Sequence, residues 1–137
     1  MTRVSESAHT AQSASNLRWG RIVGGAFLLE LVLGVVLVPP LQILGPEKVI
    51  PFVAPACFIF GFLVAWWLLR KAQNRHVVHG TLIGILATAI YVLACFANPD
   101  GFQSVLDMYG LFGFIAANGL RILGSMAGGY ASRTRAS

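Results

Sequence analysis

Four long apolar stretches, separated by short polar connections, constrain this chain more than any other feature of its sequence. Each stretch is about as long as a bilayer core is thick, so we predict membrane-spanning helices over residues 17–38, 46–70, 79–97 and 110–130. A helix satisfies every backbone donor and acceptor within one segment, as a lipid environment requires. The sequence therefore predicts an all-α fold, a polytopic membrane protein built as a four-transmembrane-helix bundle.

The composition argues against an ordinary soluble domain. Of 137 residues, 56% are hydrophobic and 11% are charged, whereas soluble proteins average about 45–50% and about 25%. The net charge of +5 does not indicate a nucleic-acid partner, because the basic residues lie at the ends of apolar stretches and not together on a polar domain. We expect a lipid bilayer around this chain and no nucleic acid as its partner.

Polar segments divide the chain into three parts. Residues 1–16 form a tail rich in Ser, Thr and Ala, which we expect to be disordered because it cannot bury enough apolar area to fold. The transmembrane domain covers residues 17–132, and residues 133–137 form a basic C-terminal tail. Within the domain, residues 39–45 predict a bend because they begin with two prolines. Residues 102–109 have the spacing of a short amphipathic segment lying in the membrane interface.

The basic residues predict an orientation. Eight of them fall on one face of the predicted bundle, and Lys48 alone falls on the other. By the positive-inside rule, both termini are expected in the cytoplasm (N-in and C-in), in the inner membrane of a bacterial-type cell. The eight are Arg3, Arg18, Arg21, Arg70, Lys71, Arg75, Arg133 and Arg135.

Two charged residues, Glu30 and Arg121, interrupt the predicted spans near their middle. Glu30 lies nine residues beyond Arg21, and Arg121 lies twelve residues before Arg133 on a helix running the other way. At 1.5 Å per residue, their depths from the same edge are about 13–14 Å and about 18 Å. An isolated charge at that depth is costly, so we predict an intramembrane Glu30–Arg121 ion pair.

Asn118 and Ser125 extend this polar group along the fourth predicted helix. They lie three residues before and four residues after Arg121, so they are expected to share nearby faces and to accept hydrogen bonds from its guanidinium. Two interpretations remain open. The pair either fixes which helices meet, which is the commoner role of a buried ion pair, or lines a pathway for protons or a substrate.

Pairs of small residues recur at four-residue spacing in each apolar stretch. Such stripes let helix backbones approach closely, which drives association when lipid and protein are equally apolar. One pair in each of four helices predicts a compact bundle, and a stripe that faces a second copy is not distinguished from one that faces the same chain. The residues are Gly20, Gly24, Gly61, Ala65, Gly80, Gly84, Gly124 and Gly128.

No arrangement of residues indicates a metal site, a cofactor or catalysis. His76 and His79 are three residues apart, but the remaining histidine, His9, lies in the N-terminal tail. We interpret Cys57 and Cys95 as small packing residues. Phosphate-binding loops, nucleophile elbows and zinc-protease motifs are absent from the sequence. We therefore predict no metal, no cofactor, no catalytic residue and no enzymatic activity.

The segment Gly24-Gly25-Ala26-Phe27-Leu28-Leu29-Glu30 resembles the first helix of small multidrug resistance transporters. In those four-helix proteins a glutamate at this place exchanges protons for cationic drugs, so the resemblance implies that Glu30 is a coupling acid. It covers seven residues, and the family's Trp-Ser-Gly segment has no counterpart between Gly84 and Tyr91. We do not assign the chain to that family.

The sequence favours a non-enzymatic membrane protein that acts through helix packing, as an oligomer or as an accessory subunit of a membrane complex. Short connections leave no soluble domain for catalysis, and the small-residue stripes suit association with a second copy or another membrane protein. The alternative is a small proton-coupled transporter or permease that uses Glu30 and Arg121.

Overall fold

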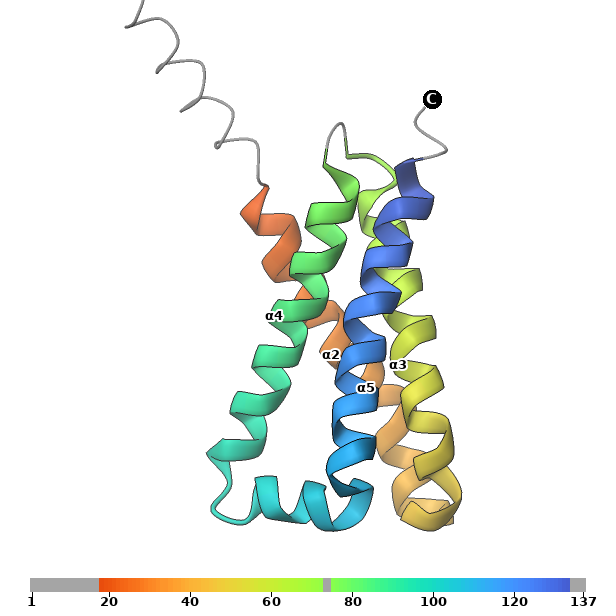
Figure 1. The fold of residues 1–137 in the computed structure, drawn as a ribbon, viewed down its shortest axis with the longest axis vertical. Coiled ribbons are helices and arrows are strands. Elements are labelled where there is room, and N and C mark those ends of the chain that lie inside the picture. The colour runs from red at the N-terminus through yellow and green to blue at the C-terminus, as the bar shows by residue number, and fades with distance from the viewer. Residues whose placement is uncertain (1–17, 73–74, 134–137) are drawn as a thin grey trace, which may run out of the picture.

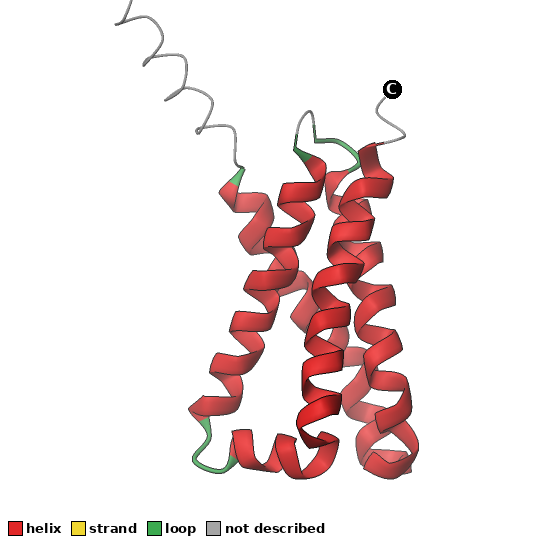
Figure 2. Cartoon of the chain, viewed as in Figure 1, coloured by secondary structure: helices red, strands yellow, loops and turns green. Residues whose placement is uncertain are grey.

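The computed structural model describes residues 18–72 and 75–133, which are helical apart from short connections and contain no strand (Figures 1 and 2). The helices are α2 (Trp19–Leu44), α3 (Pro46–Leu69), α4 (His76–Ala97) and α5 (Gly101–Arg133). They run up and down in turn, so α2 begins at the same end of the bundle where α5 finishes (Figure 1). The predicted tail of residues 1–16 and most of the predicted C-terminal tail lie outside the described residues.

All four helices are long and apolar enough to span a membrane. Large apolar side chains cover the outside of the bundle, and Phe112, Leu93 and Val35 are 86%, 69% and 67% exposed. Exposed apolar area on this scale suits contact with lipid and not with water. The structure thus supports the predicted all-α fold with four candidate membrane spans.

Helix α2 is longer than the sequence predicted. The predicted end at Val38 and the predicted bend over residues 39–45 are replaced by a helix that continues through Pro39 and Pro40 to Leu44. Each proline removes one backbone N–H from the helix, but the helical dihedral angles remain accessible to it, so the chain turns only at Gly45. There φ is +83°, a value that favours glycine, and α3 follows at once with Pro46 in its first turn and Glu47 near its positive end.

The chain enters α5 through a short segment that lies across the end of the bundle (Figures 1 and 2). This segment covers residues 101–109 and is helical, in keeping with the helical spacing of residues 102–109, while its place in a membrane interface stays a prediction. Stacked and edge-on ring contacts join Phe102 to Phe96 and Phe114. The turn into the span falls at Gly110, where φ is 68° and ψ is 162°. That backbone conformation is essentially restricted to glycine, so Gly110 defines the corner.

Glycines place α5 in close backbone contact with its two neighbours. A Cβ at Gly124 or Gly128 would collide with backbone carbonyls of α3, at Phe58 and Phe62. On the side facing α4, a Cβ at Gly84 would lie 2.7 Å from the Cα of Ile122. Small residues thus let α5 pack between α3 and α4, as stripes of this kind do in membrane bundles.

The remaining small residues divide into two groups. Gly61 and Gly80 face Ser125 of α5, and Ala65 is fully buried against Ile22, Leu69, Ala72 and Ile83. By contrast, a Cβ built at Gly20 or Gly24 would meet no atom of another described helix within 4 Å. The predicted stripe on α2 therefore does not pack against this bundle, and the neighbouring Gly25 contacts Ile83 and Leu68 in its place.

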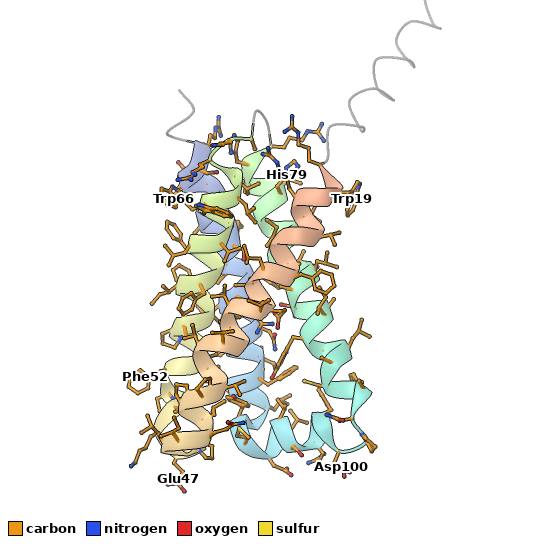
Figure 3. The ribbon with its side chains drawn as sticks, turned by 180° about the vertical axis from the view of Figure 1, so that it is seen from behind. Trp19, Glu47, Phe52, Trp66, His79 and Asp100 are labelled. Carbon is orange, nitrogen blue, oxygen red and sulfur yellow. The ribbon has the colours of Figure 1, made fainter. Side chains whose placement is uncertain are left out.

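Most basic residues of the described chain lie at one end of the bundle, and exposed acidic residues lie at the other. Figure 3 shows Trp19, Trp66 and His79 at one end, and Glu47 and Asp100 at the other. The first end also holds the basic residues at the helix boundaries, which we call the basic end; within the described ranges they are Arg18, Arg21, Arg70, Lys71, Arg75 and Arg133.

Candidate functional site

Two helices that do not touch through their backbones are joined by one pair of charged side chains. No Cα atom of α2 lies within 8 Å of a Cα atom of α5. Across this space, Nη1 of Arg121 lies 2.9 Å from Oε1 of Glu30. The side chains are 5% and 19% exposed, respectively, so both charges are largely withdrawn from solvent.

The other neighbours of Arg121 only partly satisfy its guanidinium. Its Nη2 donates to Sγ of Cys57 on α3 at 3.9 Å, and its Cζ lies 4.9 Å from the ring centroid of Tyr91 on α4. Sulfur is a weak acceptor, and an aromatic face attracts a cation without accepting a directed hydrogen bond. Buried Nε makes no hydrogen bond within the described chain, whereas Nη1 is held by the ion pair with Oε1 of Glu30. The guanidinium therefore keeps unused donor capacity.

Asn118 and Ser125 do not complete the polar network that the sequence predicted. The side-chain amide of Asn118 donates to the carbonyl of Phe114 at 2.9 Å, and its Oδ1 is buried without a partner. The hydroxyl of Ser125 is also buried without a hydrogen bond, against Gly61. Neither side chain bonds to Arg121 among the described residues, although both are buried on the same helix.

A partly open cavity of about 190 Å³ begins at the ion pair and extends away from the basic end. Glu30 and Arg121 line the end of the cavity that is nearest the basic end, and Asn118 also lines it. On the other side of the pair, toward the basic end, Ser125 and the glycines of α3 and α4 are closely packed. The other lining residues are mostly apolar or aromatic: Leu33, Gly34, Leu37, Val38, Leu41, Val53, Cys57, Tyr91, Tyr109, Phe114 and Ala117.

The ion pair lies where the closely packed part of the bundle meets the cavity. Its position between closely packed protein and a cavity means that the charges both join α2 to α5 and face an open volume. An apolar cavity with a few convergent polar groups is the usual form of a small-molecule site. Sequence reasoning missed the contributions of Tyr91, Tyr109 and Cys57, because no spacing rule shows which faces of separate helices surround one volume.

The histidines near the basic end are engaged within the bundle. Nδ1 of His76 lies 2.9 Å from the hydroxyl of Ser132. His79 pairs through Nδ1 with the carbonyl of Arg75 at 2.9 Å, and its Nε2 accepts from the backbone N–H of Arg18 at 3.2 Å. These contacts tie α2 and α5 to the start of α4. In the described part of the chain, no group of three or more His, Cys, Asp or Glu side chains is placed to hold a metal ion.

Comparison with known proteins adds no assignment: no protein-family model, curated protein or solved structure matches this chain.

Proposed function

We propose that this protein is a small, non-enzymatic membrane carrier in which a proton-linked Glu30–Arg121 ion pair gates a ligand cavity. The observation that supports this function is that the charged pair borders a cavity of about 190 Å³ and is not enclosed in close-packed protein. A purely architectural pair needs no adjoining volume, whereas a carrier needs ionisable groups that reach its ligand site.

The pair suits gating because it is an ionic contact across a gap between two backbones. Protonation of Glu30 removes its attraction for Arg121 and leaves α2 and α5 without the ion contact that joins them. Glycine contacts hold α5 to α3 and α4, and Gly25 packs against Ile83 and Leu68. The part of α2 beyond Glu30 that lines the cavity is therefore the element expected to move. We propose further that the basic end faces the cytoplasm of a cell with an inner membrane.

Reconstituted protein tests the carrier function. Liposomes that contain a trapped pH dye and the purified protein would be challenged with a panel of small organic cations and anions. We expect at least one compound to drive proton movement, which Glu30→Gln abolishes and Glu47→Gln preserves. Glu47 is an exposed acid at the start of α3, outside the cavity lining, so its loss is a matched control. Absence of proton-linked flux for every compound would overturn the proposal.

A second candidate function is an accessory subunit or oligomer. It is favoured by Gly20 and Gly24, which lie on a face of α2 that contacts nothing in the described chain. Protein that moves no ion and consistently purifies with another membrane protein, or with itself, would support this function. Replacement of Gly24 by Leu should then disrupt the complex without unfolding the bundle.

A further inference from the structure

The charge balance of the cavity narrows the class of molecule that it can hold. When both members of the pair are ionised, Glu30 and Arg121 together carry no net charge. An organic cation bound beside them would leave one uncompensated positive charge in a site surrounded by apolar side chains. An anion bound to the ionised pair would leave one uncompensated negative charge. Electroneutral binding of a charged ligand therefore requires a change in protonation.

A carboxylate bound together with one proton meets this requirement. The proton from water goes to the Glu30 carboxylate, and the ligand carboxylate takes its place as the counter-ion of Arg121. The sum of the charges remains zero before and after binding. Arginine is also the side chain that best recognises carboxylates, because its planar fork donates two parallel hydrogen bonds.

The donors of Arg121 at the ion-pair end of the cavity support this exchange. Arg121 is 95% buried and lines the cavity, and its Nε makes no hydrogen bond within the described chain. Its Nη1 faces Glu30 at 2.9 Å, so protonation of Glu30 releases Nη1 for the ligand carboxylate. The Nη2 of Arg121 donates only a weak hydrogen bond, to Sγ of Cys57 at 3.9 Å. These donors fit an anionic acceptor, and they offer nothing to an ammonium group, which is itself only a donor.

The rest of the cavity sets the size and character of the ligand. Its volume of about 190 Å³ is somewhat larger than an apolar cavity of roughly 150 Å³ that holds benzene. The difference suits one added carboxylate group. Aromatic rings at Tyr91, Tyr109 and Phe114 and the side chains of Leu33 and Leu37 provide an apolar wall for the body of the ligand.

From these observations we infer that the cavity binds a small monocarboxylate with an apolar body of about benzoate size, taken up with one proton that resides on Glu30. The substrate class rests on the proposed carrier function, since it names the ligand of the same cavity. The titratable or charged groups that face the site are Glu30 from α2, Cys57 from α3, Tyr91 from α4, and Tyr109 and Arg121 from α5. Of these, Glu30 is the carboxyl that contacts the guanidinium, so it is the group that accepts the proton.

Calorimetric titration of the purified full-length protein with benzoate tests the inference. Repeating the titration in buffers of different ionisation enthalpy counts the protons taken up. We expect about one proton per benzoate bound, with the Kd rising by up to about tenfold per pH unit as Glu30 must be protonated from an increasingly basic solution. Benzyl alcohol, a neutral molecule of similar shape, should bind much more weakly. Benzoate binding without proton uptake, equal affinity for both compounds, or no benzoate binding would each overturn the inference.

Two variants separate the roles of the charged residues. Glu30→Gln retains the guanidinium, so benzoate should still bind, without proton uptake and without the steep pH dependence. Arg121→Gln should lose benzoate binding, and Glu47→Gln should match the wild type. If Glu30→Gln does not fold, the proton count in the wild-type protein still decides the question.

Flux in liposomes distinguishes failure of the substrate class from failure of the carrier function. Benzenesulfonate is a suitable probe because it stays ionised and crosses lipid poorly, so any accompanying proton must travel on the protein. Proton-linked movement of organic cations, with no carboxylate or sulfonate binding, would overturn the substrate class and leave the carrier function intact. Binding with proton uptake but no flux would support the substrate class and overturn the carrier function.

Discussion

Breaking the Glu30–Arg121 pair should destabilise the bundle more when the glutamate is removed than when the arginine is removed. Glu30→Gln leaves a guanidinium that is 5% exposed and cannot lose its proton in a protein. Arg121→Gln leaves a carboxylate that is 19% exposed and can take up a proton. Removing one partner of a buried pair costs about 3–5 kcal/mol of unfolding free energy. We expect Glu30→Gln to fall within that range and Arg121→Gln below it.

The difference in unfolding free energy between the two single variants should depend on pH, and this dependence identifies which unpaired charge causes it. Protonation neutralises the unpaired carboxylate of Arg121→Gln, so lowering the pH from ~8 to ~5 should restore part of its stability relative to wild type. The Glu30→Gln variant should gain much less, because its unpaired charge stays on Arg121. The double variant carries neither charge and should be more stable than Glu30→Gln alone.

Unfolding free energies from detergent-to-denaturant titrations in mixed micelles measure these differences. Glu47→Gln serves as the control for loss of an acid outside the site, since Glu47 is exposed. If the two single variants lose equal stability and the double variant loses their sum, the charges do not interact and the ion pair is refuted.

Three further predictions concern packing, the corner of α5 and orientation. Gly124→Ala should cost about 1–3 kcal/mol of unfolding free energy relative to Gly119→Ala, because the first Cβ meets the Phe58 carbonyl and the second meets nothing within 4 Å; equal stabilities in micelles would contradict this contact. Gly110→Ala should cost about 1–3 kcal/mol because φ is 68° and ψ is 162° there, measured in the same way. Membrane-impermeant thiol reagents should label Lys48→Cys but not Lys71→Cys in intact cells, in a background without native cysteines, and the reverse pattern would contradict the proposed orientation.

Depth could be read from the sequence because helix rise is constant. Counting residues from Arg21 and from Arg133 predicted similar depths for Glu30 and Arg121. In the structure, Oε1 of Glu30 and Nη1 of Arg121 lie 2.9 Å apart. The same rule explains why Asn118 and Ser125 do not act together. At 1.5 Å per residue they lie about 4.5 Å and about 6 Å from Arg121 in opposite directions, so one lines the cavity and the other lies in the packed half.

Rotational position was much harder to predict than depth. In water, the polar face of a helix reveals which side is exposed, but in lipid both faces are apolar. The stripe at Gly124 and Gly128 contacts α3, whereas the equally spaced stripe at Gly20 and Gly24 contacts nothing in the described chain. Spacing alone contains no information that separates these two cases.

The rule that proline ends a helix also failed in α2, which contains two prolines. The two prolines at positions 39 and 40 predicted the end of a helix, yet α2 continues to Leu44. The extension adds Leu41 to the cavity lining and carries α2 along the side of the volume that separates it from α5. A cavity of this kind depends on the distance between two helices far apart in the sequence, so it could not be derived from either helix alone.

Accessibility of Cys57 in the folded protein tests most directly whether the ion pair borders an open volume. Cys57 lines the cavity and accepts from Arg121, yet its own exposure is 1%. In a Cys95→Ser background, a small methanethiosulfonate reagent should modify Cys57 much faster than the bundle unfolds. Gly34→Phe should suppress that reaction, because Gly34 lines the same cavity with no atom within 4 Å of its Cβ position. Modification only at the rate of global unfolding, unchanged by Gly34→Phe, would show that the pair is enclosed and would contradict the proposed ligand site.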